Sequence, residues 1–335
     1  MESIAVVGAT GHTGRFVVDE LERRSLRPVC VGRDARKLAE LRAAHPTRVV
    51  RAASSEDPES LNAALAGCVA VINCAGPFLD TALPVADAAL RAKIPYLDIT
   101  AEQAAVQRLQ TRDANARDAG IVLLPAAAFY GGLADVLATA ALDGEVTIDE
   151  ISIAVALDSW HPTEGTRRTG ARNTAPRLIV RGGTLAPIPD PQPKASWVFP
   201  APFHEQEVLM LPFSETITLS RHLRAASIES WINATALRDV RDAATPAPAP
   251  ADSRGRSSQN FVMDVRVRAG ERRARATAAG RDIYAASAPI IVEAAQRLLA
   301  PDARGAGVRS LGEVVDARDF LRALAVTGDL AWTLA

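Results

Sequence analysis

Residues 3–24 read SIAVVGATGHTGRFVVDELERR, and this stretch decides the fold. It opens with a short, continuous apolar run, which is typical of a strand covered on both faces. Three glycines follow, and then Phe16, Val17 and Leu21 recur at helical spacing with polar residues opposite. The order of strand, glycine turn and helix predicts the first half of a βαβ unit. The start of its helix presents free N–H groups and the positive end of a dipole, which suits an anion.

The three glycines have separate expected roles in binding a dinucleotide. Gly8 allows the sharp turn, Gly11 lets a pyrophosphate approach the backbone, and Gly14 lets the helix pack close to the strand. The polar residues of the same loop, Thr10, His12 and Thr13, complete this part of the predicted cofactor site. Glycines also end strands for purely structural reasons, and that alternative stays open.

The end of the second predicted strand favours NADP over NAD. In NAD sites an acidic residue about 20 positions beyond the glycines holds the ribose 2′-hydroxyl. Here Arg33 occupies that place and Lys37 lies one helical turn later, and a guanidinium suits a 2′-phosphate. Asp34 either caps the next helix or touches a ribose. Lys37 could equally be an ordinary surface residue.

The first 128 residues alternate between strands and helices. Six predicted strands, the last at residues 121–128, alternate with helices that include one long helix over residues 102–120. This alternation predicts a doubly wound, Rossmann-type parallel sheet, whose ligands bind at the carboxyl ends of the strands. Residues 73–78 and 98–102 are expected at that edge.

Composition bounds the class of protein. A chain of 335 residues suggests about two domains, and 48% hydrophobic residues can form large cores. The net charge of -1 gives no attraction to nucleic acid or to acidic membranes. With three cysteines, no apolar run long enough to cross a membrane and no secretory signal, we expect a soluble cytoplasmic protein.

The second half has a different pattern. Residues 149–157 and 229–237 alternate as long strands, and residues 177–185 and 259–280 suggest hairpins around Gly182 and Gly270. We expect a mostly antiparallel sheet in a second α+β domain. In two-domain dehydrogenases such a sheet often forms a substrate lid and a subunit contact, so by analogy we expect a homodimer.

The expected domain limits follow from this change of pattern. A Rossmann domain would span residues 1–140, and a substrate and oligomerisation domain would span residues 141–283 with a flexible loop at 242–259. Helices at 284–299 and 316–325 belong to a final segment, residues 284–335, which is expected to pack back on the Rossmann domain.

Four segments in this order resemble a known family. They are GATGHTGR (8–15), GRDARKL (32–38), VINCAGPFLDTALPVADAAL (71–90) and IPYLDITAEQ (94–103). Over roughly residues 1–140 the chain resembles the NADP-binding domain of saccharopine-dehydrogenase-like reductases, which include trans-acting enoyl reductases. The resemblance implies NADP(H) as cofactor and gives a cofactor role to the turn made by Asn73, Ala75, Gly76, Pro77 and Phe78.

The chain also departs from that family. Where relatives often have a Gly-Phe-Asp stretch, this chain has AAAFYGGLADVLA at residues 126–138, and it is shorter than the full-length saccharopine enzymes. The resemblance therefore implies no particular substrate.

Four residues are candidates for the chemistry of hydride transfer, which also needs a proton donor. Asp98 ends the fifth strand and could orient a substrate or a water, or it could satisfy backbone N–H groups. Tyr130 follows the sixth strand as a candidate donor, or it is an aromatic residue covering the domain junction. His161 and Arg168 lie in the polar segment 158–170, as a proton donor and a carboxylate ligand or as loop residues.

Other chemistries lack their motifs. No His, Cys and Asp cluster has the spacing of a metal site, and no G-x-S-x-G elbow or Tyr-x-x-x-Lys pair is present. We therefore expect an NADP(H)-dependent oxidoreductase that acts on a C=N or an activated C=C or C=O bond of a small metabolite. The alternatives are a non-catalytic NADP-binding sensor or scaffold and a nucleotide-dependent epimerase or dehydratase.

Overall fold

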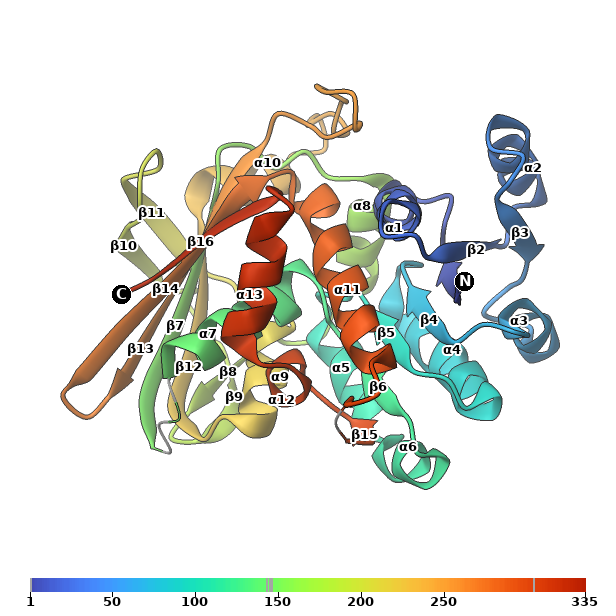
Figure 1. Ribbon diagram of the computed structural model, residues 1–335. Coiled ribbons are helices and arrows are strands. Elements are labelled where there is room, and N and C mark those ends of the chain that lie inside the picture. The colour runs from blue at the N-terminus through green and yellow to red at the C-terminus, as the bar shows by residue number, and fades with distance from the viewer. Residues whose placement is uncertain (1, 143, 145–146, 304) are drawn as a thin grey trace.

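Two sheets lie side by side in the computed structural model, which describes residues 2–142, 144, 147–303 and 305–335 (Figure 1). Met1, Asp143, Glu145, Val146 and Arg304 fall within the expected domain ranges but lie outside the described residues. In the described part, the first sheet has seven parallel strands in the order β15-β6-β5-β4-β1-β2-β3. The strands are β1 (Ser3–Val7), β2 (Arg27–Gly32), β3 (Val49–Ala52), β4 (Ala70–Asn73), β5 (Tyr96–Asp98), β6 (Val122–Leu124) and β15 (Gly307–Val308).

Helices connect these strands as a doubly wound fold requires. They are α1 (His12–Arg23), α2 (Ala35–Ala44), α3 (Pro58–Leu65), α4 (Phe78–Ala92), α5 (Gln103–Gln110) and α6 (Asp113–Ala119). Two begin at aspartates whose carboxylates accept backbone N–H groups, Asp34 for α2 and Asp57 for α3. The Rossmann-type fold predicted from the sequence is confirmed.

One predicted helix is divided in two. The single helix expected over residues 102–120 stops at Gln110 and starts again at Asp113. The Thr111 hydroxyl donates to the carbonyl of Arg108 at 2.7 Å, while the N–H of Arg112 bonds Leu109, three residues back. These short-range bonds replace the helical ladder, which helical periodicity alone does not reveal.

The second sheet is mostly antiparallel, as predicted. In the described residues it has nine strands, with the main order β10-β11-β12-β7-β13-β14-β16, and β8 pairs with both β12 and β9. Its strands are β7 (Ile148–Leu157), β8 (Leu178–Arg181), β9 (Thr184–Pro187), β10 (Lys194–Val198), β11 (Glu205–Met210), β12 (Ala225–Asn233), β13 (Asn260–Ala269), β14 (Arg272–Arg281) and β16 (Leu330–Leu334). The hairpins at Gly182 and Gly270 are both present, while β7 and β12 pair in parallel.

The strand expected over residues 229–237 is wrong in its second half. It ends at Asn233, and α10 (Ala234–Arg241) begins at once. The Asn233 side chain donates to the carbonyl of Leu157 at 2.9 Å and accepts its N–H at 3.1 Å, so it binds the neighbouring strand as a backbone would. Residues 242–259 form no regular element, as expected, and their flexibility stays a prediction.

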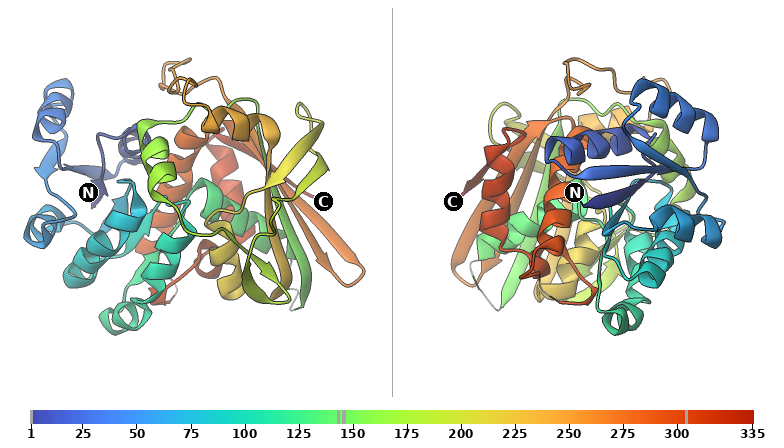
Figure 2. Two further views of the ribbon diagram at one scale, coloured as in Figure 1. Left: turned by 180° about the vertical axis from the view of Figure 1, so that it is seen from behind. Right: turned by 45° about the vertical axis from the view of Figure 1, so that its right-hand side comes forward.

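The remaining helices cover one face of this sheet and join it to the first one. They are the π-helical turn η1 (Phe129–Leu133), α7 (Ala134–Leu142), α8 (Glu164–Arg172), α9 (Glu215–His222), α11 (Ile283–Leu299), α12 (Leu311–Val314) and α13 (Ala317–Val326). Seen from behind, α8 lies between the two sheets (Figure 2).

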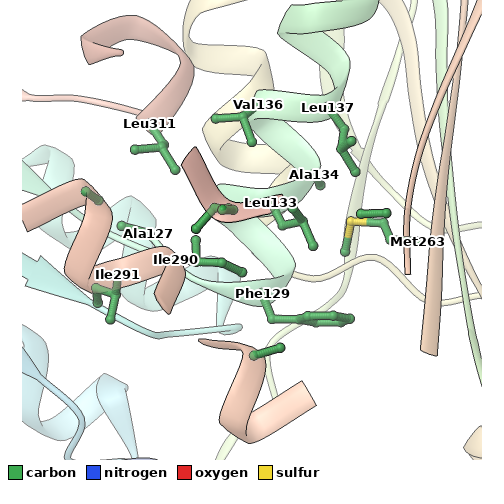
Figure 3. Packing of buried hydrophobic residues seen from close by; sticks show 14 of the residues in the cluster. Ala127, Phe129, Leu133, Ala134, Val136, Leu137, Met263, Ile290, Ile291 and Leu311 are labelled. Carbon is green, nitrogen blue, oxygen red and sulfur yellow. The ribbon is translucent and has the colours of Figure 1, made fainter. Parts of the chain in front are cut away.

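The chain returns to the first domain through α11. This helix packs beside α1 (Figure 1), where Arg24 pairs with Glu293 and donates to the amide of Gln296 at 2.7 Å. The apolar side of α11 meets the segment η1–α7: Figure 3 shows Phe129 and Leu133 between Met263 of β13 and Ile290 of α11. One continuous core therefore connects the two sheets.

Candidate coenzyme and substrate site

The glycine loop is shaped as its sequence predicts. Gly8 has φ +82°, and a Cβ there would lie 2.8 Å from the N atom of Ala75. A Cβ on Gly14 would lie 2.2 Å from the carbonyl oxygen of Gly8, so only glycine lets α1 pack this close to the turn. Gly11 precedes α1, and no side chain caps the first N–H groups of this helix. The loop leaves these donors for an anion.

The end of β2 carries the predicted adenosine-binding side chains. Arg33 is exposed, and it has no hydrogen-bond or ion-pair partner among the described residues. Asp34 takes the capping role, because its carboxylate accepts the N–H of Lys37 at 3.1 Å. Lys37 is exposed too. Arg33 follows β2, the strand that pairs with β1, and β1 leads into the glycine loop. Since no described residue bonds its guanidinium, the N–H donors of Arg33 can bind a 2′-phosphate.

The turn after β4 is held by a buried asparagine. Asn73 accepts the N–H of Ala75 at 3.0 Å and donates to the Thr81 hydroxyl at 3.2 Å, and Thr81 donates to the carbonyl of Ala75 at 2.5 Å. Asn73 is fully buried, and its side-chain hydrogen bonds hold the turn in its conformation. Pro77 is the residue before α4, while Gly76 and Phe78 reach the cavity described next.

A cavity of about 900 Å³ lies between the two halves of the chain. The first domain contributes the loops after β1, β4, β5 and β6, and the second contributes α8, α10 and the start of α11. Residues on its wall include Thr13, Cys74, Gly76, Phe78, Ile99, Glu102, Phe129, Tyr130, Trp160, Thr163, Thr166, Arg167, Thr169, Arg177, Phe213, Leu237, Arg241, Ile283 and Tyr284. By area the wall is largely apolar, and it also carries hydroxyl, amide and charged side chains.

Asp98 is buried beneath this cavity and is not part of its wall. Its carboxylate accepts the N–H groups of Ala126 at 2.8 Å and Thr100 at 2.9 Å, and the hydroxyl of Tyr96 at 2.7 Å. Burial raises the pKa of Asp98 to about 6, against these hydrogen bonds. These contacts correspond to the structural alternative, in which Asp98 satisfies backbone N–H groups.

Tyr130 does reach the cavity. Its ring lies 4.2 Å from that of Phe213 between centroids, and its hydroxyl is buried without a partner in the described part of the chain. Burial raises the pKa of this phenol well above its usual value, so Tyr130 keeps its proton. Of the four catalytic candidates, it is the one whose side chain lines the cavity.

The segment 158–170 contributes other residues than those chosen from the sequence. His161 and Arg168 do not line the cavity, and Arg168 is exposed and pairs with Glu164. Their neighbours Thr166 and Arg167 do line it. Because α8 begins after Thr163, whose hydroxyl accepts the N–H of Thr166 at 3.0 Å, helical spacing turns Arg168 away from this wall.

Tyr284 connects this segment to the glycine loop. Its hydroxyl lies 2.9 Å from that of Thr166 and accepts the indole N–H of Trp160 at 3.1 Å. Its ring lies 5.3 Å from that of His12. Burial lowers the pKa of His12, and its Nε2 atom is buried with no described partner. The predicted loop histidine therefore faces the second domain as a neutral ring.

Sequence reasoning missed several wall residues. Arg177 and Phe213 stand in no motif, and only the pairing of distant segments places them beside Tyr130. Glu102 directly precedes α5, but its side chain caps α4: its carboxylate accepts the N–H of Phe78 at 2.7 Å. Its other oxygen is buried without a described partner, and burial raises its pKa.

The described residues offer neither a metal site nor a membrane span. They contain no group of three or more His, Cys, Asp or Glu side chains that could hold a metal ion. No helix among them is both long and apolar enough to span a membrane.

Comparison with known proteins shows what the first domain and the whole fold are similar to. Residues 4–124 match the family described as the saccharopine dehydrogenase NADP binding domain. No curated protein sequence matches the chain. Among solved structures, the chain is similar to apo histidine-tagged saccharopine dehydrogenase (L-Glu forming) from Saccharomyces cerevisiae, with a TM-score of 0.70, 12% identity and coverage of 100% of both chains.

Two further structures are similar over parts of the chain. Triphenylmethane reductase of Citrobacter sp., complexed with NADP(H), has 24% identity and a TM-score of 0.31 over 44% of this chain and 57% of that one. Vestitone reductase from alfalfa has 21% identity and a TM-score of 0.27 over 31% and 39%.

The residues present fit the cofactor that the family implies. The glycine cradle, the uncapped start of α1 and the unpaired Arg33 match pyrophosphate and 2′-phosphate in charge and space. Residues 4–124 therefore form an NADP-binding domain that is similar to that of saccharopine dehydrogenase, NADP(H) is the cofactor, and the whole chain has the fold of saccharopine dehydrogenase.

Proposed function

We propose that this protein is an NADP(H)-dependent oxidoreductase that transfers a hydride to or from a C=N or an activated C=C or C=O bond of a small metabolite. The main observation that supports this proposal is the cavity between the two halves of the chain. It brings the coenzyme loops of the first domain, through Thr13 and Gly76, opposite the polar face of α8. A space of about 900 Å³ has room for a nicotinamide and a substrate together.

The residues of the chain have distinct proposed roles in this reaction. When bound, NADPH supplies the hydride from its nicotinamide ring. The phenol of Tyr130 holds a proton and gives it to the atom that gains negative charge as the double bond is reduced. Since burial raises the pKa of Tyr130, the acceptor has to be strongly basic, as an enolate oxygen or an amine nitrogen is. The apolar wall keeps water from competing.

The coenzyme residues keep their sequence-based roles in the proposal. Gly8, Thr10, Gly11, His12, Thr13 and Gly14 form the loop around the pyrophosphate, Arg33 and Lys37 hold the 2′-phosphate, and the turn of Asn73, Ala75, Gly76, Pro77 and Phe78 backs the nicotinamide ribose. Asp98 has an indirect proposed role: its carboxylate accepts N–H groups of the loops after β5 and β6 and so holds these loops in position beside the cavity. His161 and Arg168 do not line the cavity, so neither is assigned a role in this proposal.

The open cavity is also what separates this function from the sensor. A protein that binds NADP without turnover needs no space beside the nicotinamide, whereas a crevice lined by polar groups of residues 158–170 favours catalysis. Thr163, Thr166, Arg167 and Thr169 line the cavity and supply such groups. An epimerase or dehydratase would use the same coenzyme loops, and net consumption of NADPH separates it from a reductase.

The deciding experiment uses Tyr130→Phe. The change removes a hydroxyl that has no described hydrogen-bond partner, so we expect folding and NADPH affinity to stay within about 0.5 kcal/mol of wild type. Absorbance of NADPH is followed against a panel of imines, enones and ketones. We expect turnover by the wild type and a loss of about 100-fold in kcat in the variant. Unchanged kcat in the variant would remove Tyr130 from the chemistry, and NADPH binding without any turnover would favour the sensor.

Location and assembly complete the proposal. A reducing cytoplasm suits three cysteines that are all free thiols. A homodimer is proposed by analogy with two-domain dehydrogenases, and light scattering of the purified protein measures it directly. Its partners are small molecules, since the net charge of -1 offers no pull toward nucleic acid.

A further inference from the structure

The cavity contains a guanidinium without a carboxylate partner. Arg177 lies directly before β8 and lines the cavity in a half-buried position. One of its N–H groups donates to the carbonyl of Pro212 at 2.8 Å, and the guanidinium carbon lies 4.8 Å from the centroid of the Phe213 ring. Among the described residues, no carboxylate forms an ion pair with it. Four of its five N–H donors therefore have no described protein acceptor.

The ionisable groups around Arg177 do not compensate its charge by contact. They are Glu215, Tyr130, Glu102 and Arg241. Burial raises the pKa of both glutamates, so each is neutral to a higher pH than usual. Each also has an Oε2 atom that is buried without a described partner. A partly desolvated arginine with so few acceptors is unfavourable unless another anion reaches it.

Most of the remaining wall is hydrophobic. Phe78 and Phe129 come from the first domain, and Trp160, Leu237 and Ile283 come from the second. Such a wall gains free energy from an apolar ligand in proportion to the area that it covers.

Of the other charged side chains on the wall, Glu102 accepts the N–H of Phe78 and Arg167 donates to backbone carbonyls of residues 242 and 245. Asp190 and Arg241 are exposed, so Arg177 is the half-buried guanidinium of the described wall with most of its donors unused.

We propose that the substrate is a mainly apolar molecule with one carboxylate, and that this carboxylate binds the guanidinium of Arg177. The inference rests on the proposed function, because it assigns the substrate class of the same site. A guanidinium holds a carboxylate by two parallel hydrogen bonds, which fixes direction as well as position. Binding of the carboxylate by Arg177 would thus fix the orientation of the substrate's reacting double bond.

Calorimetry with simple probes tests the proposal on the full chain, with and without NADPH. The probes are decanoate, its neutral analogue decan-1-ol, and succinate, which is charged but has little apolar surface. We expect decanoate to bind at least about tenfold more tightly than either of the others. Equal affinities for decanoate and decan-1-ol, or no binding of decanoate, would overturn the assignment.

Two substitutions locate the effect. Arg177→Met keeps the stem and its packing but removes the charge, and we expect the preference for decanoate to fall at least about tenfold. Arg177→Lys keeps the positive charge but cannot form two parallel hydrogen bonds to a carboxylate, so it should retain part of the preference for decanoate. Arg181→Met is the matched control, because Arg181 lies on β8 and is exposed outside the cavity wall. A similar loss in the control, or none in Arg177→Met, would contradict the proposal.

The outcome separates this inference from the proposed function. Carboxylate binding that depends on Arg177, in a protein that never oxidises NADPH, would overturn only the reductase. Turnover of neutral substrates with no dependence on Arg177 would overturn only the substrate class.

Discussion

Arg33 is the side chain on which the choice of coenzyme depends. It is exposed at the end of β2 and keeps its donors free, while Asp34 is occupied as the cap of α2. A free guanidinium beside the expected position of the adenosine ribose distinguishes NADP from NAD by one phosphate.

The variant Arg33→Ala should lose that distinction. We expect the Kd for NADPH to rise about tenfold or more, since a charge-assisted pair is lost, while the Kd for NADH stays unchanged. Titrations followed by nicotinamide fluorescence give both constants. Lys37→Ala is the control, and a larger effect there than in Arg33→Ala would transfer the role to the lysine.

Asp98 makes the stability of the protein depend on pH. Its pKa in the folded chain is raised from 3.8 to about 6, so the folded state holds this proton more tightly than the unfolded state does. Folding stability due to this group is therefore greatest below pH 4 and falls as the pH rises toward 6. A shift of this size corresponds to about 3 kcal/mol.

The variant Asp98→Asn should remove this part of the pH profile. One oxygen of the asparagine can still accept the N–H groups of Ala126 and Thr100, so the turn is kept. Urea unfolding at a series of pH values from 4 to 7 measures the effect. We expect the wild type to lose up to about 3 kcal/mol relative to the variant over this range. Parallel profiles would show that Asp98 ionises normally.

At the scale of elements, the pairing of α1 with α11 holds the two ends of the fold together. Arg24 contacts Glu20 within its own helix and Glu293 and Gln296 across the interface. These side chains are largely buried, so removing one of them would leave an uncompensated charge away from water.

Glu293→Gln should weaken this interface. We expect a loss of about 1–3 kcal/mol in the free energy of unfolding, because Arg24 keeps only one of its two carboxylates. The control is Glu40→Gln, which breaks the exposed pair with Arg36 and should cost less than about 0.5 kcal/mol. Chemical denaturation compares the two variants. Equal losses would mean that burial of the Arg24 cluster adds nothing.

Local pattern identified most elements of the first domain and failed where long-range contacts decide. The alternating strands and the glycine loop follow from residues close together in the chain. β15 and β16 are short segments that become strands only by pairing with β6 and β14, far away in the sequence. The break at Thr111 and the end of β12 at Asn233 depend on hydrogen bonds made by the side chains of these two residues, which no periodicity shows.

The same distinction holds for the site. The coenzyme loop could be found from its glycines, because backbone conformation is what it requires. The cavity wall could not, since Arg177, Phe213 and Tyr284 meet only after the two domains pack. The sequence placed Asp98 at the end of the fifth strand, but it could not tell whether the side chain faces the cavity or the buried turn, where it accepts the hydroxyl of Tyr96.

At the scale of the whole molecule, the expected domain limits stay a prediction that fragments can test. The segment η1–α7 is buried against β13 and α11, and the face of α1 is covered by α11. We therefore expect residues 1–140 alone to lack a stable tertiary structure, and the full chain to unfold in one transition. Near-ultraviolet circular dichroism and calorimetry measure both. A folded fragment, or two separate transitions, would contradict this expectation.

The return of α11 to α1 also matters during synthesis. Residues 3–124 leave the ribosome first, yet the helix that covers α1 is made only when residue 299 has been added. Until then the nascent chain carries an uncovered apolar stripe, which a molecular chaperone would recognise. Folding of the coenzyme half is thus postponed until α11 has been made.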